Sequence, residues 1–350
     1  MNRCLISIIT GLLLLGCTQR QEPVSPPWGS SEDTVFTDEF DLGQIEQAGE
    51  LIAVTLSGPE TYYDFRGSHL GVHYLLCEAF ARHLGVKLRM ELCHDTLELI
   101  QRLNDDADLA AIDFSHDSLE VGWRVGEGKP DLREALTAWF NPTMIADARQ
   151  QEKQLLSQPR VQRRVFAPML SKGVISRYDN LFKLYSKRIA WDWRLLAAQC
   201  YQESTFDPNA RSWAGAQGLM QIMPQTADHL GLARTDMNKP EQNIEAAVRY
   251  LKELDREFST IRERQERQNM VLAAYNGGIH HVRDAMRLAE RDGCNPQRWS
   301  DVRQYILLLS NPQYYQDPLV EHGYMRGSET ADYVDKIRQR FQTYRRSVRP

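Results

Sequence analysis

The hydrophobic and polar positions of the first half of the chain alternate between two periods. Residues 51–56 form a short apolar run of β-favouring residues, and residues 72–84 carry apolar side chains at helical spacing. Residues 86–90 alternate apolar and polar positions, as a half-buried strand does. Helical spacing returns at residues 96–103, and residues 109–112 are apolar again. Strands that alternate with helices predict an α/β domain with a partly parallel sheet.

From about residue 178 onward the period is helical almost throughout. Before that, residues 148–170 begin with a charged, Gln-rich stretch, which is typical of a linker or of a solvated connecting helix. We therefore expect an α/β domain over residues 41–147 and an all-α domain over residues 171–350. Gly, Pro and Asn separate the expected helices, which lie at about 178–190, 193–205, 222–231, 241–258, 267–276, 278–291, 300–309 and 330–344.

The first residues have the pattern of an export signal. Arg3 precedes an apolar run over residues 5–15, which is too short to span a bilayer as a mature helix. The run ends in Leu-Leu-Gly-Cys17, which resembles a bacterial lipobox, where the cysteine is lipidated after cleavage. A plain signal peptide with an incidental Cys17 is the alternative. We predict a lipoprotein signal peptide over residues 1–17 and a flexible tether over residues 18–40, which is rich in Pro, Ser, Glu and Gln.

Length, charge and cysteines limit the protein's compartment and partners. A chain of 350 residues suits two domains. The net charge of −5 comes without a basic stripe, so we expect no nucleic-acid partner. Export and lipidation predict a place in the cell envelope, facing the periplasm. Thr18 rather than Asp after the cysteine predicts the outer membrane, by the rule known for enteric bacteria.

The four cysteines that follow Cys17 have the spacing of neither a zinc site nor a redox motif, and we expect no metal site from them. In an oxidising compartment, Cys77 and Cys93 are a candidate disulfide pair. Free buried thiols are the alternative, and Cys200 and Cys294 complete the set.

A single carboxyl group interrupts the apolar face of the helix expected over residues 193–205. Leu196, Cys200 and Glu203 stand at positions i, i+4 and i+7, so they share one face. A carboxyl held on an inward face loses hydration, which raises its pKa, and a general acid near neutral pH needs that tuning. A buried glutamate paired with a distant arginine for structural reasons would show the same pattern.

Two more segments carry polar groups among apolar ones. In the loop over residues 212–224, Ser212 and Gln221 lie among large apolar side chains, a mixture that a sugar-binding groove needs. A glycine-rich turn over a core is the alternative. The segment Val-Leu-Ala-Ala-Tyr-Asn-Gly-Gly over residues 271–278 closes a helix and places Tyr275 in its last turn. By itself this segment is more typical of a helix cap than of a catalytic element.

Together these segments resemble the catalytic domain of the soluble-type (family 1) lytic transglycosylases. The resemblance rests on YQESTFDPNARSWAGAQGLMQIMPQTA and LAAYNGG, which match that family's Glu-Ser helix, Gly-Leu-Met-Gln-Ile-Met-Pro loop and Ala-Tyr-Asn-x-Gly helix. It implies a lysozyme-like fold and non-hydrolytic cleavage of the β-1,4 bond between N-acetylmuramic acid and N-acetylglucosamine, leaving 1,6-anhydro ends. It implies no cofactor and no metal.

By motif position, the resemblance implies that Glu203 is the single catalytic acid/base. A hydrolase would need a second carboxylate, but the nearby Asp207 precedes Pro208, so we expect it to form a turn. Ser212 and Gln221 would hold the N-acetyl and neighbouring groups, and Tyr275 would orient the Glu203 carboxyl or the substrate. The expected substrate-binding residues are Ser212, Gln221, Met223, Tyr275 and Glu329.

The first domain resembles one lobe of the family-3 periplasmic solute-binding proteins. The likeness rests on GELIAVTL, GVHYLLCEAFARHLGVKLRMEL and DTLELIQRLNDDADLAAIDF, and on a closing segment that begins near Trp123. Only ten residues separate Ile112 from Trp123, too few for the second lobe. A truncated single lobe that serves as a scaffold, or as a surface for cell-wall proteins, is the resulting expectation. With the lipobox, the whole arrangement resembles the membrane-bound F-type lytic murein transglycosylases.

Two alternatives to a lytic transglycosylase stay open. One is a muramidase that uses water, and the other is an inactive scaffold that binds peptidoglycan through the same groove. Analysis of the cleavage products separates the two enzymes, and a Glu203→Gln variant separates either enzyme from the scaffold.

Overall fold

The computed structural model describes residues 40–65, 67–111, 122–158 and 161–349. The expected signal peptide, Cys17 and nearly all of the tether lie outside these ranges. Among the helices of these ranges, none has the length and apolar character needed to cross a membrane.

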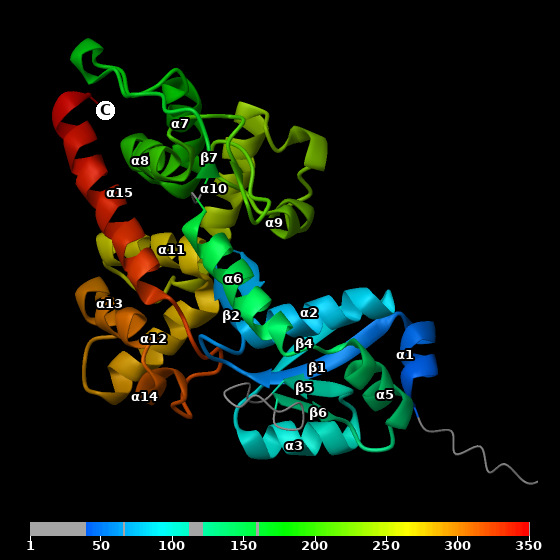
Figure 1. The fold of residues 1–350 in the computed structure, drawn as a ribbon. Helices are drawn as coiled ribbons and strands as arrows, with labels where there is room; N and C mark the ends of the chain where they lie inside the picture. The colour runs from blue at the N-terminus through cyan, green and yellow to red at the C-terminus, as the bar shows by residue number, and fades with distance from the viewer. Residues whose placement is uncertain (1–39, 66, 112–121, 159–160, 350) are drawn as a thin grey trace, which may run out of the picture. The chain divides into compact units, whose positions relative to one another are not determined.

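The first domain is built on a four-stranded sheet in the order β4-β1-β5-β6 (Figure 1). The central strand β1 (Glu50–Leu56) pairs in parallel with β4 (Lys87–Cys93) and with β5 (Leu109–Ala111). The edge strand β6 (Trp123–Val125) runs antiparallel to β5. The prediction of an α/β domain with a partly parallel sheet is therefore confirmed.

Helices cover both faces of this sheet because β1 is apolar on both sides. Leu51 and Ala53 pack into one cluster with α2 (Val72–Leu84) and α5 (Pro130–Trp139). Val54 packs into another cluster with α3 (Thr96–Asp105).

One carboxylate joins two helix starts at the edge of this domain. Asp41 caps α1 (Leu42–Ala48), and its carboxylate also accepts hydrogen bonds from the backbone N–H groups of Asp131 (2.8 Å) and Leu132 (3.0 Å) in α5. The beginning of the described chain is thereby fixed to the domain.

A short hairpin and a long helix complete the domain, and the sequence analysis missed the hairpin. Its strands are β2 (Tyr63–Phe65) and β3 (Ser68–Leu70), which pair antiparallel. The helix α6 (Thr143–Ser157) packs against the hairpin through Leu155 and Leu156, and Tyr63 donates a hydrogen bond to Glu152 at 2.8 Å. The segment expected to be a linker or a connecting helix thus begins as a helix, and the expected boundary at residue 147 lies inside α6.

The second domain is helical, as predicted, and it surrounds the helix α8 (Trp193–Ser204). The long helix α15 (Gly327–Ser347) and the short helix α7 (Asp179–Ser186) pack directly on α8 (Figure 1). The remaining helices of more than four residues are α9 (Pro224–His229), α10 (Pro240–Glu257), α11 (Arg264–Gly277), α12 (Ile279–Arg291) and α13 (Trp299–Leu308). Ten of the twelve residues of α8 are buried, so this helix forms the centre of the domain.

A partly buried ion pair fixes the start of α8. Asp192 caps the helix through the backbone N–H of Arg194 (2.9 Å), and its carboxylate pairs with the Arg194 guanidinium at 2.6 Å. The same guanidinium donates to the carbonyl of Val348 at 2.7 Å. Arg194 therefore ties the end of the described chain to the helix at the centre of the domain.

The cysteines in the described ranges are free thiols. Cys77, Cys93 and Cys200 are buried, and Cys294 is half-buried. The sequence left two alternatives, a Cys77–Cys93 disulfide and free thiols. The structure has free thiols at both positions.

Candidate active site

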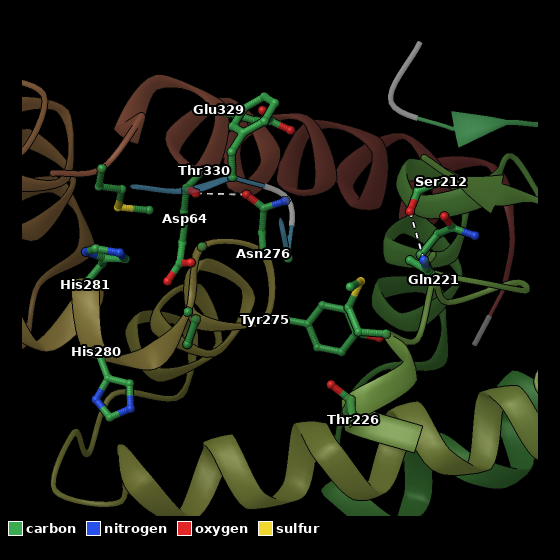
Figure 2. A pocket seen from close by; sticks show the side chains of 18 of the residues that line it. Asp64, Ser212, Gln221, Thr226, Tyr275, Asn276, His280, His281, Glu329 and Thr330 are labelled. Carbon is green, nitrogen blue, oxygen red and sulfur yellow. Dashed lines mark hydrogen bonds between the residues drawn. The ribbon is translucent and has the colours of Figure 1, made fainter. Parts of the chain in front are cut away.

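A single groove contains every substrate-binding or catalytic residue expected from the sequence. Figure 2 shows Ser212 and Gln221 at one end of this groove, with Tyr275 between them and Asp64. The expected site residues in its lining are Glu203, Ser212, Gln221, Met223, Tyr275 and Glu329. Their proximity agrees with a shared site, and the role of each stays a prediction.

Glu203 lies in the last turn of α8 and is almost completely buried, with 1% of its surface exposed. Leu196 and Cys200 on the same face are also buried, as the helical spacing predicts. The Tyr333 hydroxyl donates a hydrogen bond to Oε1 of Glu203 at 2.5 Å. The carboxyl group is thus held in a low-dielectric environment by a neutral donor, where a change in its protonation has large energetic consequences.

Tyr333 is a candidate functional residue that the sequence analysis missed. It lies on α15 and is itself buried, with 1% of its surface exposed. The matching segment Glu-Thr-Ala-Asp-Tyr-Val drew attention to Glu329, four residues earlier. A one-turn offset on the same helix separates the two residues, and only the packing of α15 on α8 identifies Tyr333 as the partner of Glu203.

The end of α8 is held by a segment that sequence analysis assigned to the linker. Arg163 donates to the backbone carbonyl of Glu203 at 2.8 Å. The backbone then turns sharply, because Thr205 and Phe206 both have positive φ angles (50° and 64°). The Thr205 hydroxyl donates to the carbonyl of Arg164 at 2.9 Å. The Arg163 bond satisfies a helix-end carbonyl, and the Thr205 bond stabilises the strained turn directly after the candidate catalytic residue.

The loop after α8 presents an amide oxygen to the groove. The side-chain N–H₂ of Gln221 donates to the carbonyls of Ala210 (3.1 Å) and Gly218 (2.9 Å). Its Oε1 atom is buried and has no hydrogen-bond partner in the described ranges. Ser212 Oγ accepts a hydrogen bond from the backbone N–H of Ala216 at 2.9 Å. The loop therefore fixes Gln221 through its donors and leaves an acceptor for a ligand N–H.

Gly218 allows this loop to pack closely on the domain. Its φ angle of +82° is one that side chains rarely adopt. A Cβ atom at this position would also overlap the carbonyl oxygen of Met237 and the side chain of Asn243. Only glycine satisfies both conditions.

Tyr275 joins the last turn of α11 to the same loop. Its hydroxyl donates to the carbonyl of Met220 at 2.8 Å, and its ring packs against Tyr250 with centroids 5.5 Å apart. The structure thus gives Tyr275 a role in positioning the loop. Orientation of the Glu203 carboxyl or of the substrate by Tyr275 stays a prediction.

Asp207, the nearest second carboxylate in sequence, is used by the backbone. Its two oxygens accept from the backbone N–H groups of Arg164 (2.6 Å) and Asn209 (3.0 Å), and it is buried. This agrees with the expected turn.

Within the described ranges, no group of three or more His, Cys, Asp or Glu side chains is arranged to hold a metal ion.

The other end of the groove has a lining that the sequence analysis did not assign to the site. The hairpin contributes Asp64 and His69, and the helical domain contributes His280, His281 and His322. His280 and His281 are adjacent on α12, so they point to different sides of the helix. The His322 ring lies against both of them, and all three line the same groove.

Part of the chain is similar to known proteins. Residues 180–296 match the family described as the transglycosylase SLT domain. The membrane-bound lytic murein transglycosylase F of Desulfosudis oleivorans is 40% identical over 163 residues, which cover 47% of this chain and 35% of the relative. The protein of the same name from Enterobacter sp. is 29% identical over 458 residues, which cover 97% of this chain and 85% of the relative.

Other similarities cover smaller parts. The transglycosylase F of Aeromonas salmonicida is 38% identical over 49% of this chain and 34% of its own length. The aligned part of the chain spans about a third of the length of the Desulfosudis and Aeromonas relatives. Among solved structures, the 70 kDa soluble lytic transglycosylase of Escherichia coli aligns at 22% identity with a TM-score of 0.34, over 63% of this chain and 31% of that one. Residues 180–296 thus match the transglycosylase SLT domain, and the chain is similar to proteins named membrane-bound lytic murein transglycosylase F.

Proposed function

We propose that this protein is a lytic transglycosylase that cleaves the bond between N-acetylmuramic acid and N-acetylglucosamine in peptidoglycan. The observation that carries the proposal is the buried Glu203 carboxyl, which faces the groove and accepts a hydrogen bond from Tyr333. The names of the relatives support the substrate and the reaction class. Asp207 is occupied by backbone N–H groups, so it does not supply the second carboxylate of a hydrolase.

One carboxyl group is sufficient for the proposed reaction. Protonated Glu203 donates its proton to the glycosidic oxygen, and the bond to the muramoyl anomeric carbon breaks with assistance from the muramoyl N-acetyl group. The Glu203 carboxylate then takes the proton of the muramoyl C6 hydroxyl, whose oxygen closes the 1,6-anhydro ring. The proton returns to Glu203 and no water is consumed. Tyr333 stabilises the carboxylate between the two steps, because its O–H donates to that oxygen.

The loop and the helix ends supply the proposed contacts to the sugar. The free Oε1 of Gln221 accepts the N–H of an N-acetyl group, with Ser212 beside it, and Met223 provides apolar surface for a sugar ring. Tyr275 and Glu329 line the same groove and contact neighbouring groups. The proposed site needs no cofactor.

The proposed location is the cell envelope, with a lipid on Cys17 and the outer membrane as the attachment site. The relatives' name supports attachment to a membrane. A tether over residues 18–40 would separate the anchor from the folded domains. The α/β domain would be a single lobe of the solute-binding type, available to cell-wall proteins.

Digestion of purified peptidoglycan sacculi tests the proposal. We expect wild-type protein to release muropeptides that end in 1,6-anhydro-N-acetylmuramic acid, identified by mass spectrometry, and Glu203→Gln to release almost none. Glu290→Gln, on an exposed turn of α12, is the matched control and should behave like the wild type. Reducing ends instead of anhydro ends would identify a muramidase. Binding to sacculi without release of products would identify a scaffold.

A further inference from the structure

The groove continues past the candidate catalytic residues to a second group of polar side chains. We call this group the Asp64 subsite, and it consists of Asp64, His69, His280, His281 and His322. Figure 2 shows Asp64, His280 and His281 on the far side of Tyr275 from Ser212 and Gln221. A glycan bound at Glu203 would therefore have this subsite available for a group attached to it.

The hairpin that carries Asp64 is fixed to the helical domain. The Phe65 ring stacks on Trp213, with centroids 6.3 Å apart, and the Arg326 guanidinium lies 4.8 Å from the Phe65 centroid. Side chains alternate along a strand, so buried Tyr63 and Phe65 turn Asp64 to the opposite face. The alternation places the Asp64 carboxyl in the groove while its two neighbours anchor the strand.

The Asp64 carboxyl is charged and accessible. Desolvation opposes its ionisation, but the hydrogen bond from His69 (2.6 Å) and the electrostatic effect of that imidazole outweigh this and lower the pKa of Asp64. Its side chain is 56% exposed. A carboxylate in this state attracts a cation, and a groove wall around it strengthens the attraction.

Two of the neighbouring histidines are poorly suited to carry a charge. Burial opposes protonation of His280 and His281 and lowers the pKa of both. Asp284, which faces the same histidines, is fully buried and pairs with Arg287. Of these two carboxylates, Asp64 is therefore the exposed one that a ligand can reach.

His281 supplies an independent sign of a ligand. The residue is only 6% exposed, lines the groove, and has an Nδ1 atom without a hydrogen-bond partner in the described ranges. A buried polar atom without a partner is energetically unfavourable, and this one lies in the wall of a groove, where a bound ligand can supply the partner.

We propose that the Asp64 subsite binds the peptide stem of peptidoglycan through the stem's free ammonium group. This inference rests on the proposed function, because it names the part of the same substrate that the subsite recognises. The glycan itself carries no cation, whereas a stem with a diamino acid carries an ammonium group that Asp64 can accept. The imidazoles around Asp64 offer hydrogen bonds to the amides of the stem. The α/β domain then contributes substrate selectivity to the catalytic groove.

Three forms of one substrate test this inference with the full chain. They are glycan strands with intact stems, the same strands with stem amines acetylated, and strands with stems removed by an amidase. We expect the wild type to cleave intact strands with a kcat/KM about three- to tenfold above that for the other two, as suits a half-exposed ion pair. Asp64→Asn should cleave all three at the lower rate.

Two variants sharpen the result. Asp64→Lys should reverse the preference, because its ammonium group repels the intact stem and tolerates the acetylated one. Asp105→Asn, at an exposed position on α3, should keep the wild-type preference.

Equal wild-type rates on all three substrates, or an unchanged preference in Asp64→Asn, would overturn the inference. A wild type that slows only when the stem is removed would also overturn it, because the ammonium group would then play no part. Failure of the proposed function looks different, since no substrate would then give anhydro products.

Discussion

The two walls of the groove use the same chemical group in opposite environments. On the helical wall, Glu203 is 1% exposed and accepts a hydrogen bond from Tyr333. On the hairpin wall, the Asp64 side chain is 56% exposed and accepts from His69. Burial beside a hydroxyl donor suits a carboxyl that gives and takes a proton, whereas exposure with an imidazole partner suits a carboxylate that stays charged. The difference assigns chemistry to one wall and recognition to the other.

Replacing the carboxyl group of each wall in turn should give the largest difference in enzymatic activity. Glu203→Gln should reduce kcat about 10³-fold, because general acid–base catalysis contributes about 10²–10⁴-fold. Asp64→Asn should reduce kcat/KM on intact strands by at most about tenfold. Steady-state release of anhydromuropeptides measures both. A similar loss in the two variants would contradict the division of roles.

Gly218→Ala tests how much the helical wall depends on its backbone. We expect a loss of about 3 kcal/mol in the free energy of unfolding, from the positive φ angle together with the overlap at Met237. Urea denaturation followed by circular dichroism measures the change. Gly231→Ala is the matched control, because Gly231 has a φ of +66° and open space around its Cβ position. It should cost only about 1 kcal/mol, and an equal cost at both positions would exclude the overlap as a cause.

Tyr333→Phe tests the hydrogen bond that distinguishes Glu203 from Asp64. A hydrogen bond to a charged group contributes about 1.5–3 kcal/mol, so kcat should fall about ten- to a hundredfold. The phenylalanine ring fills the same space, and KM should change little. The pH profile of kcat should also shift upward, because the Tyr333 hydroxyl favours the carboxylate form of Glu203. An unchanged pH profile would show that Tyr333 serves packing alone.

Asp192→Asn should lower the free energy of unfolding without changing the residues of either groove wall. Desolvation opposes ionisation of Asp192, but the hydrogen bonds and charge of Arg194 outweigh it and lower the pKa of Asp192. Such a group stabilises the fold above its unfolded pKa of about 3.9, and the contribution is lost as the pH falls through the folded value. We expect the variant to be about 1–2 kcal/mol less stable at pH 7, with the difference shrinking below about pH 4. Thermal unfolding at both pH values measures this, and a constant difference would contradict the charge effect.

The sequence predicted the helical wall well because its signals are local. The spacing of Leu196, Cys200 and Glu203 needs only the period of one helix, and the loop with Gln221 follows directly in the chain. Long helices and the alternation of strands with helices in the first domain were predictable for the same reason. The roles assigned to these residues still await the experiments above.

The hairpin wall could not be predicted because it is assembled from segments far apart in the chain. Each hairpin strand has three residues, too few to show a period. Asp64 comes within reach of His281 and His322 only through the packing of Phe65 on Trp213. The Tyr333 contact with Glu203 spans 130 residues and depends on the packing of α15 on α8.

The buried thiols offer a way to time the opening of each domain separately. Cys77 in the α/β domain and Cys200 in the helical domain are both fully buried, and burial raises the pKa of the Cys77 thiol to about 12 and that of Cys200 further. A thiolate-specific alkylating reagent therefore reacts with either residue only after the surrounding helices separate. Mass spectrometry of the two cysteine-containing peptides after timed alkylation would give one opening rate per domain, with no foreign probe. The same measurement with a glycan bound would show whether a ligand in the groove slows both openings or only one.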